Sequence, residues 1–169
     1  TPTLKARFSE LCSVCRWTAG NRTNTAAGLC RRIILRRINM EIEIGAKYRV
    51  SDNVTKEKTA LAVGSGGLEV YATPCMSALM EKAAFTLLSR FLPEGNGSVG
   101  ISLSLEHSSA TPVGLDVTAE AEITDVSGRI VTFSISAWDE KGEIGRCIHK
   151  RCIVENERFA AKAAKKLDK

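Results

Sequence analysis

The sequence contains no run of about 18 consecutive apolar residues, the length that a membrane-spanning helix requires, so we predict that no segment crosses a membrane. No secretory signal precedes its cysteines, which favours reduced thiols in a cytoplasmic protein. No fourth Cys or His follows the first three cysteines at zinc-ligand spacing, so we predict no metal site. The chain has six cysteines, three near its beginning and three scattered further on: Cys12, Cys15, Cys30, Cys75, Cys147 and Cys152.

Positive charge is also missing from most of the chain, although the net charge is +5. Residues 1–39 carry eight Lys and Arg against one acidic residue, whereas residues 40–169 carry 16 against 18. The basic character therefore belongs to the beginning of the chain. The remainder lacks the charge signature of a nucleic-acid-binding protein, and we expect no nucleic-acid partner.

Residues 1–39 show no helical or strand periodicity and no helix-turn-helix pattern. Their Arg-rich, acid-poor composition is similar to that of a mitochondrial transit peptide. A regular pattern begins abruptly at Met40, so we interpret 1–39 as a leader upstream of a natural start at Met40. A flexible basic arm that contacts anionic partners is the alternative. We predict one domain over residues 40–160, followed by a Lys-rich tail over 161–169.

One long helix is predicted to begin around Thr73-Pro74, where Thr73 would cap it and Pro74 would occupy the first helical position. Glu81 falls at the edge of an apolar face with helical spacing. This face consists of Met76, Leu79, Met80, Ala83, Ala84, Leu87, Leu88 and Phe91.

The rest of the chain alternates as strands do. We predict two strands before the helix, over 41–50 and 58–63, and four after it, over 99–107, 115–124, 129–139 and 144–155. Tight turns join most of the later strands, so the sheet should be antiparallel, with one face in need of cover. One apolar-faced helix supplies that cover. The predicted fold is α+β, a hotdog fold in which a curled antiparallel sheet wraps around one central helix.

His107 is the most informative candidate for chemistry. It continues the parity of Val99, Ile101, Leu103 and Leu105, which predicts that it points toward the helix. An imidazole titrates near neutrality and suits a general base that acts on water, although a partly buried His bonded to a carbonyl is the simpler explanation.

Three other side chains have both a structural and a functional explanation. Glu81 is either a solvated residue on the helix flank or a carboxylate that orients water or an imidazole. The Thr73 hydroxyl either caps the helix or lies beside backbone N–H groups that could hold an oxyanion. His149 and Arg151 share a parity on the last strand, which is either an exposed basic strand or a contact for a phosphorylated carrier such as coenzyme A (CoA).

Together these residues resemble the hotdog-fold acyl-CoA thioesterases of the fluoroacetyl-CoA thioesterase type. The resemblance covers residues 41–160. It rests on Thr73, on Glu81 eight residues later and on His107 another 26 later. Three sequence runs around these positions carry it as well: 63–84, 100–114 and 145–159.

The resemblance implies hydrolysis of an acyl-CoA thioester by Thr73, Glu81 and His107, with no cofactor beyond the CoA carried by the substrate. It implies that Gly66, Gly100 and Arg151 contact the substrate or its CoA. It also implies a homodimer with each acyl pocket near the interface.

One departure from the family bears on specificity. The fluoroacetyl-specific enzyme carries aromatic gating residues just before its catalytic Thr, whereas residues 64–68 here read Gly-Ser-Gly-Gly-Leu. We therefore expect a short- or medium-chain acyl-CoA hydrolase rather than a fluoroacetyl-specific one. The alternatives are a non-catalytic acyl-CoA-binding or sensing protein and a hotdog enoyl-CoA hydratase.

Overall fold

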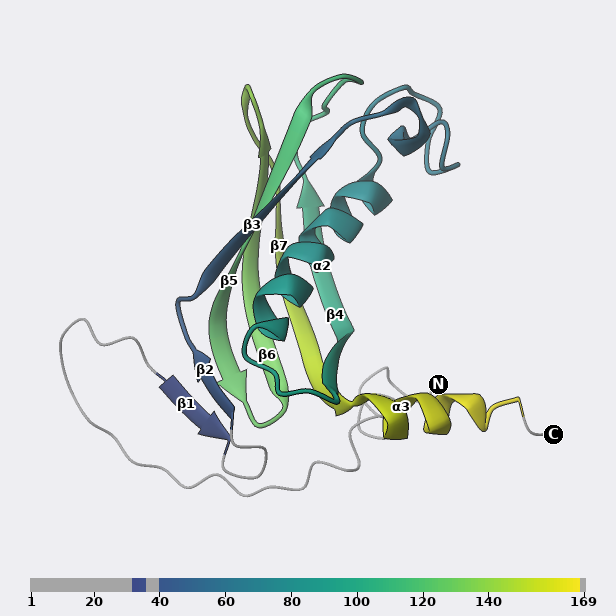
Figure 1. Cartoon of the computed structure of the whole chain (residues 1–169). Helices are drawn as coiled ribbons and strands as arrows, with labels where there is room; N and C mark the ends of the chain where they lie inside the picture. Colours follow the sequence, from purple (N-terminus) through teal and green to yellow (C-terminus); the bar gives the residue numbers. More distant parts are fainter. Residues whose placement is uncertain (1–31, 36–39, 168–169) are drawn as a thin grey trace, which may run out of the picture.

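A five-stranded antiparallel sheet, in the order β3-β5-β6-β7-β4, carries helix α2 against one of its faces (Figure 1). The computed structural model describes residues 32–35 and 40–167. The sheet is open, with β3 and β4 at its two edges. The predicted α+β architecture is therefore confirmed. Its elements are β3 (Lys47–Asn53), α2 (Thr73–Ser89), β4 (Asn96–His107), β5 (Asp116–Ser127), β6 (Ile130–Asp139) and β7 (Gly142–Glu155).

Helix α2 packs on the sheet through the predicted apolar face. Seven residues of that face are buried, and Phe91 just beyond the helix is partly buried. Each fully buried Leu or Met contributes roughly 1.5–3 kcal/mol of transfer free energy, so this face fixes where the helix lies. The sheet contributes its own inward residues, namely Val117, Ala119, Ala121, Ile123, Phe133 and Ile135.

The start of α2 differs from the prediction. Ala72 is the N-cap, in an extended conformation, and Thr73 is the first helical residue rather than the cap. Ala72 offers no side-chain cap; its carbonyl accepts hydrogen bonds from the Cys75 and Met76 N–H groups. The Thr73 hydroxyl therefore does not cap the helix.

The segments before α2 also differ from the prediction. The strand predicted over 41–50 is interrupted at Gly45, whose φ of +89° turns the chain between β2 (Met40–Glu43) and β3. The strand predicted over 58–63 is wrong. A short 3₁₀ helix, η1 (Lys56–Lys58), leads into a loop that folds back on itself. In this loop the Ala60 N–H donates to the Val70 carbonyl and the Leu61 N–H to the Leu68 carbonyl.

A β-bulge in β4 overturns part of the predicted alternation. Gly100 lies opposite Arg151 and Ser102 opposite Lys150, so Ile101 is the extra residue. Residues directly opposite in an antiparallel pair project from the same face. Gly100 therefore faces α2 together with Arg151, and the parity prediction for Val99, which lies opposite Cys152, is wrong.

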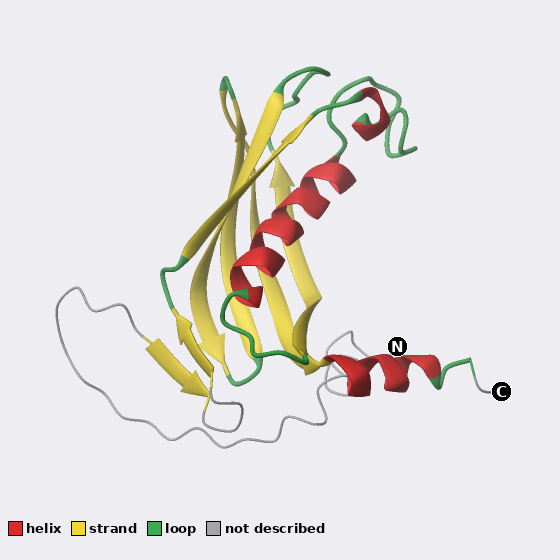
Figure 2. Cartoon of the chain, in the orientation of Figure 1, coloured by secondary structure: helices red, strands yellow, loops and turns green. Residues whose placement is uncertain are grey.

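The remaining elements lie at the edges of this frame (Figure 2). Strand β1 (Arg32–Leu35), within the predicted leader, pairs antiparallel with β2. The Lys-rich tail follows and partly overlaps helix α3 (Asn156–Ala164), which has no buried residue. Among the described residues, no helix is both long and apolar enough to span a membrane. The first three cysteines lie outside the described residues, which contain no group of three potential metal ligands.

Candidate active site

Thr73 and His107 meet at the beginning of α2. The Thr73 Oγ1 lies 2.9 Å from the His107 Nδ1. Thr73 reaches it from the first turn of the helix, and His107 from the end of β4, where it lies opposite Gly145. The prediction that His107 points toward the helix is confirmed, because the bulge at Ile101 lies before this part of the strand.

The second nitrogen of His107 is buried and has no hydrogen-bond partner within the described residues. Burial lowers the pKa of the His107 imidazole below its usual value, and a backbone group of Ser109 opposes this shift. A neutral imidazole with an unused ring nitrogen is the state that a general base requires at pH 7.

The mouth of α2 offers fewer amide donors than an ordinary helix start. Pro74 has no N–H, and the Cys75 and Met76 N–H groups both donate to the Ala72 carbonyl, at 2.9 and 3.0 Å. The Thr73 N–H has no acceptor within the part of the chain that the structure describes. Thr73 therefore offers an unused amide donor beside the His107 ring, at the positive end of the helix.

Glu81 belongs to a second cluster. Its Oε1 lies 3.5 Å from the His149 Nε2 and 3.6 Å from the Arg151 Nη1, and 43% of its side chain is exposed. Gly100 leaves room for this carboxylate, because a Cβ on Gly100 would stand 2.6 Å from the Glu81 Oε1. Glu81 also lines a hollow of about 310 Å³ beside the edge strand β4, together with Ser77, Gly100, Ile101, Ser102, Leu103 and His149.

Arg151 is held almost entirely by protein groups. It is 7% exposed, and its Nε and Nη2 donate to the Oγ and the carbonyl of Ser98, each at 2.9 Å. Its Nη1 lies 3.2 Å from the His149 Nε2. The guanidinium therefore faces Glu81 inside the fold, and its predicted contact with CoA stays a prediction.

Gly66, also predicted to contact the substrate, lies in the exposed loop before α2. Its N–H donates to the Ala60 carbonyl. The same loop exposes Leu61, Val63 and Leu68, which are 54%, 43% and 69% exposed. No described contact joins Gly66 to either cluster, and its role stays a prediction.

The two clusters are separated along α2. At a rise of about 1.5 Å per residue, the eight residues from Thr73 to Glu81 span roughly 12 Å. One protomer therefore unites Thr73 with His107, and Glu81 with Gly100 and Arg151, but it does not unite Glu81 with His107.

His149 is the residue whose place the sequence argument missed. It is 1% exposed, so the interpretation of an exposed basic strand is wrong for it. The signal was present in the sequence, because His149 shares its parity with the apolar Cys147 and Ile153, both of which are buried.

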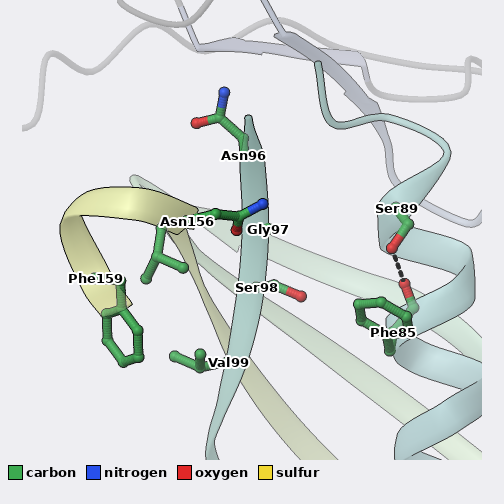
Figure 3. A pocket seen from close by; sticks show the side chains of 9 residues that line it. Phe85, Ser89, Asn96, Gly97, Ser98, Val99, Asn156 and Phe159 are labelled. Carbon is green, nitrogen blue, oxygen red and sulfur yellow. Dashed lines mark hydrogen bonds between the residues drawn. The ribbon is translucent and has the colours of Figure 1, made fainter. Parts of the chain in front are cut away.

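A second hollow, of about 360 Å³, lies between α2, β4 and α3 (Figure 3). Figure 3 shows Phe85 and Phe159 on opposite sides of β4, with Ser98 between them. None of its lining residues has a titratable side chain. This hollow therefore offers no group for acid–base catalysis.

The sheet and its single central helix define the chain as a hotdog-fold protein. A hot-dog-like protein from Thermanaerovibrio acidaminovorans superposes with a TM-score of 0.69 at 23% identity, over 75% of this chain and 93% of that one. The predicted likeness to thioesterases rests on Thr73, Glu81 and His107, of which one protomer pairs only Thr73 with His107.

The family follows from the sequence matches. The model of the fluoroacetyl-CoA-specific thioesterase family matches residues 54–157. The fluoroacetyl-CoA thioesterase of Streptantibioticus cattleyicolor is 41% identical over 98 residues, which are 58% of this chain and 70% of that protein. A variant of the fluoroacetyl-CoA-specific thioesterase FlK, solved with fluoroacetate and CoA, superposes with a TM-score of 0.67 at 33% identity, over 70% of this chain and 99% of that one. The chain belongs to the fluoroacetyl-CoA-specific thioesterase family.

Proposed function

We propose that this protein hydrolyses short- or medium-chain acyl-CoA thioesters to the free acid and CoA, as a cytoplasmic homodimer that needs no cofactor. The observation that carries the proposal is the bonded Thr73–His107 pair with its unused ring nitrogen, at a helix mouth that also presents an unused amide donor. A base and an oxyanion donor are what hydrolysis of a thioester carbonyl requires.

The separation of Glu81 from His107 supports a site shared between two subunits. Strand β4 is a sheet edge 12 residues long, and an unpaired edge of this length is a ready template for pairing with a second chain. The hollow beside Glu81 is lined by residues of this same edge. In the proposed dimer, Glu81 of one subunit faces Thr73 and His107 of the other.

Each residue then has one role. The His107 nitrogen accepts a proton from a water that Glu81 orients, and the oxygen of that water bonds to the carbonyl carbon. In the alternative, Glu81 attacks the carbonyl carbon and displaces the CoA thiolate, and a water activated by His107 then hydrolyses the resulting anhydride. The Thr73 hydroxyl holds the ring of His107, and the Thr73 N–H donates to the oxyanion. The C–S bond breaks, the CoA thiolate takes up the proton held by His107 and the acid is released.

The loop before α2 determines the range of acyl groups in this proposal. Residues 64–68 have no aromatic side chain, and Gly66 allows the loop backbone to approach the CoA part of the substrate. A site without an aromatic gate should accept several acyl chains rather than select fluoroacetyl.

The test is a panel of acyl-CoA thioesters monitored for free thiol, followed by mixing of two inactive variants. His107→Asn and Glu81→Gln should each lower kcat/KM at least about a hundredfold, the usual worth of a positioned base. When the two variants are dissociated and reassembled together, heterodimers regain one intact site in two, so about one quarter of the wild-type activity should return in a twofold-symmetric dimer.

Addition of water without thiol release would instead indicate a hydratase, and binding without turnover a sensor. If reassembly restored nothing, the shared site would be refuted.

A further inference from the structure

His149 has a defined protonation state because of its two partners. Its Nδ1 lies 2.9 Å from the backbone carbonyl of Ser102, which can only accept a hydrogen bond. The Nδ1 must therefore carry a proton. Its Nε2 lies 3.2 Å from the Arg151 Nη1, which can only donate, and 3.5 Å from the Glu81 Oε1, which can only accept; the shorter contact favours a lone pair on Nε2. These two contacts select the neutral Nδ1–H tautomer.

The surroundings agree with a neutral ring. His149 is buried, and burial lowers its pKa; the guanidinium of Arg151 lowers it further, whereas the Ser102 carbonyl and the Glu81 carboxylate oppose the shift. Phe133 of β6 covers another side, with ring centroids 6.2 Å apart. Because its one lone pair is engaged by Arg151, His149 cannot act as a second base toward water.

His149 also ties the β4 bulge to the Glu81 cluster. Ser102, whose carbonyl it binds, directly follows the extra residue Ile101. Its Cε1, between the two ring nitrogens, would be 3.1 Å from a Cβ on Gly100. One imidazole therefore contacts the bulge, the glycine gap and the guanidinium that faces Glu81.

We propose that His149 is a positioning residue for Glu81: as the neutral Nδ1–H tautomer it accepts a hydrogen bond from Arg151 and holds the guanidinium against the Glu81 carboxylate. This inference rests on the proposed catalytic role of Glu81. Ser98 fixes two guanidinium nitrogens of Arg151 and His149 fixes the third, so the cation has one orientation. Without the His149 lone pair, Nη1 loses its partner and the carboxylate loses a fixed neighbour.

The tautomer can be observed directly. The chain has only two histidines, so ¹⁵N NMR of histidine-labelled protein at pH 7, with a His107→Asn variant for assignment, isolates the His149 ring. We expect the signature of a protonated Nδ1 and an unprotonated Nε2. A protonated Nε2 would overturn the proposal without any substitution at His149.

Two substitutions separate the two hydrogen bonds. In His149→Gln the side-chain carbonyl can take the place of Nε2 and accept from Arg151, whereas in His149→Asn the amide can replace Nδ1 and donate only to Ser102. We expect kcat to fall roughly 10- to 100-fold in His149→Asn with KM little changed, and to stay within a few fold of wild type in His149→Gln, because displacement of a reacting group by about 1 Å has such an effect. Equal loss in both variants, or no loss in His149→Asn, would overturn the proposal.

A double-mutant cycle distinguishes this inference from the proposed function. In a Glu81→Gln background, His149→Asn should cause little further loss, because both changes act through the same carboxylate. Full activity of Glu81→Gln alone would refute the proposed role of Glu81. Strong loss in Glu81→Gln together with an additive effect of His149→Asn would refute the positioning role alone.

Discussion

Gly100→Ala should separate activity from stability. The new methyl carbon would stand 2.6 Å from the Glu81 Oε1 and 3.1 Å from the His149 Cε1. An ordinary contact begins near 3.4 Å, so the carboxylate must retreat by about 0.8 Å. The Glu81 carboxylate lies at the end of a flexible side chain that is 43% exposed, so the carboxylate can move at little cost in folding free energy.

The Gly100→Ala substitution should therefore lower the reaction rate rather than the stability of the fold. Displacement of a reacting group by about 1 Å can lower the rate by a factor of about 100, which corresponds to roughly 2.7 kcal/mol. We expect kcat/KM to fall 10- to 100-fold. The free energy of unfolding should change by less than about 1 kcal/mol, because loss of glycine flexibility in the unfolded chain offsets the small shift of the His149 ring.

The assay combines thiol release from an acyl-CoA with thermal or urea unfolding. Ser134→Ala is the control, because Ser134 is exposed on β6 and belongs to neither cluster nor to the loop before α2; it should retain wild-type turnover. In a Glu81→Gln background, Gly100→Ala should add little. Wild-type turnover in Gly100→Ala would refute the reasoning, and so would a loss of stability of several kcal/mol.

Three further outcomes follow from the histidines and their partners. Thr73→Val should lower kcat about tenfold and stability by about 1 kcal/mol, because a partly buried ring nitrogen loses its partner, whereas Thr73→Ser should retain both in the same assays. In a pH–rate profile, kcat/KM should rise with pH to a plateau, with a midpoint below about 6.5, because burial lowers the pKa of His107 and the neutral ring is the active form; a midpoint above about 6.5 would contradict this. In urea titrations, the free energy of unfolding should fall as the pH drops below about 6.5 toward the folded pKa values of His107 and His149, since the unfolded chain binds more protons there. Each histidine contributes at most about 1.4 kcal/mol per pH unit. The variant His149→Gln should show a weaker pH dependence.

The features that the sequence predicted correctly are those set by periodicity. The apolar face of α2 recurs at helical spacing, and a broad stripe of this kind requires burial, which the strands that follow provide. The strands after the helix alternate cleanly and are joined by turns with glycine at positive φ, as at Gly128 and Gly142. Pairing of Thr73 with His107 follows from that frame, because the helix start and the end of β4 meet at one end of the sheet.

The features that were missed depend on single tertiary contacts. An isolated Thr before Pro predicts a cap, but His107 takes the Thr73 hydroxyl and a backbone carbonyl closes the first turn instead. The exposed strand predicted around His149 is wrong, because His149 shares its parity with the buried Cys147 and Ile153 and turns inward with them. In the fold, Arg151 and Ser102 satisfy the buried imidazole, and sequence spacing does not reveal such partners.

The bulge at Ile101 explains how one strand serves both clusters. On the C-terminal side of the bulge, His107 faces the beginning of α2. On its N-terminal side, Gly100 faces Glu81 on the same helix. These positions differ by seven residues, an odd number, so an unbroken strand would project them to opposite faces. Without the bulge, a strand that kept His107 inward would project Gly100 to the opposite face, and the Glu81 carboxylate would lose the space that this glycine leaves beside it. The extra residue thus allows a base at one end of the strand and a space for a carboxylate further along it. In the proposed dimer, each of the two subunits would contribute one such strand.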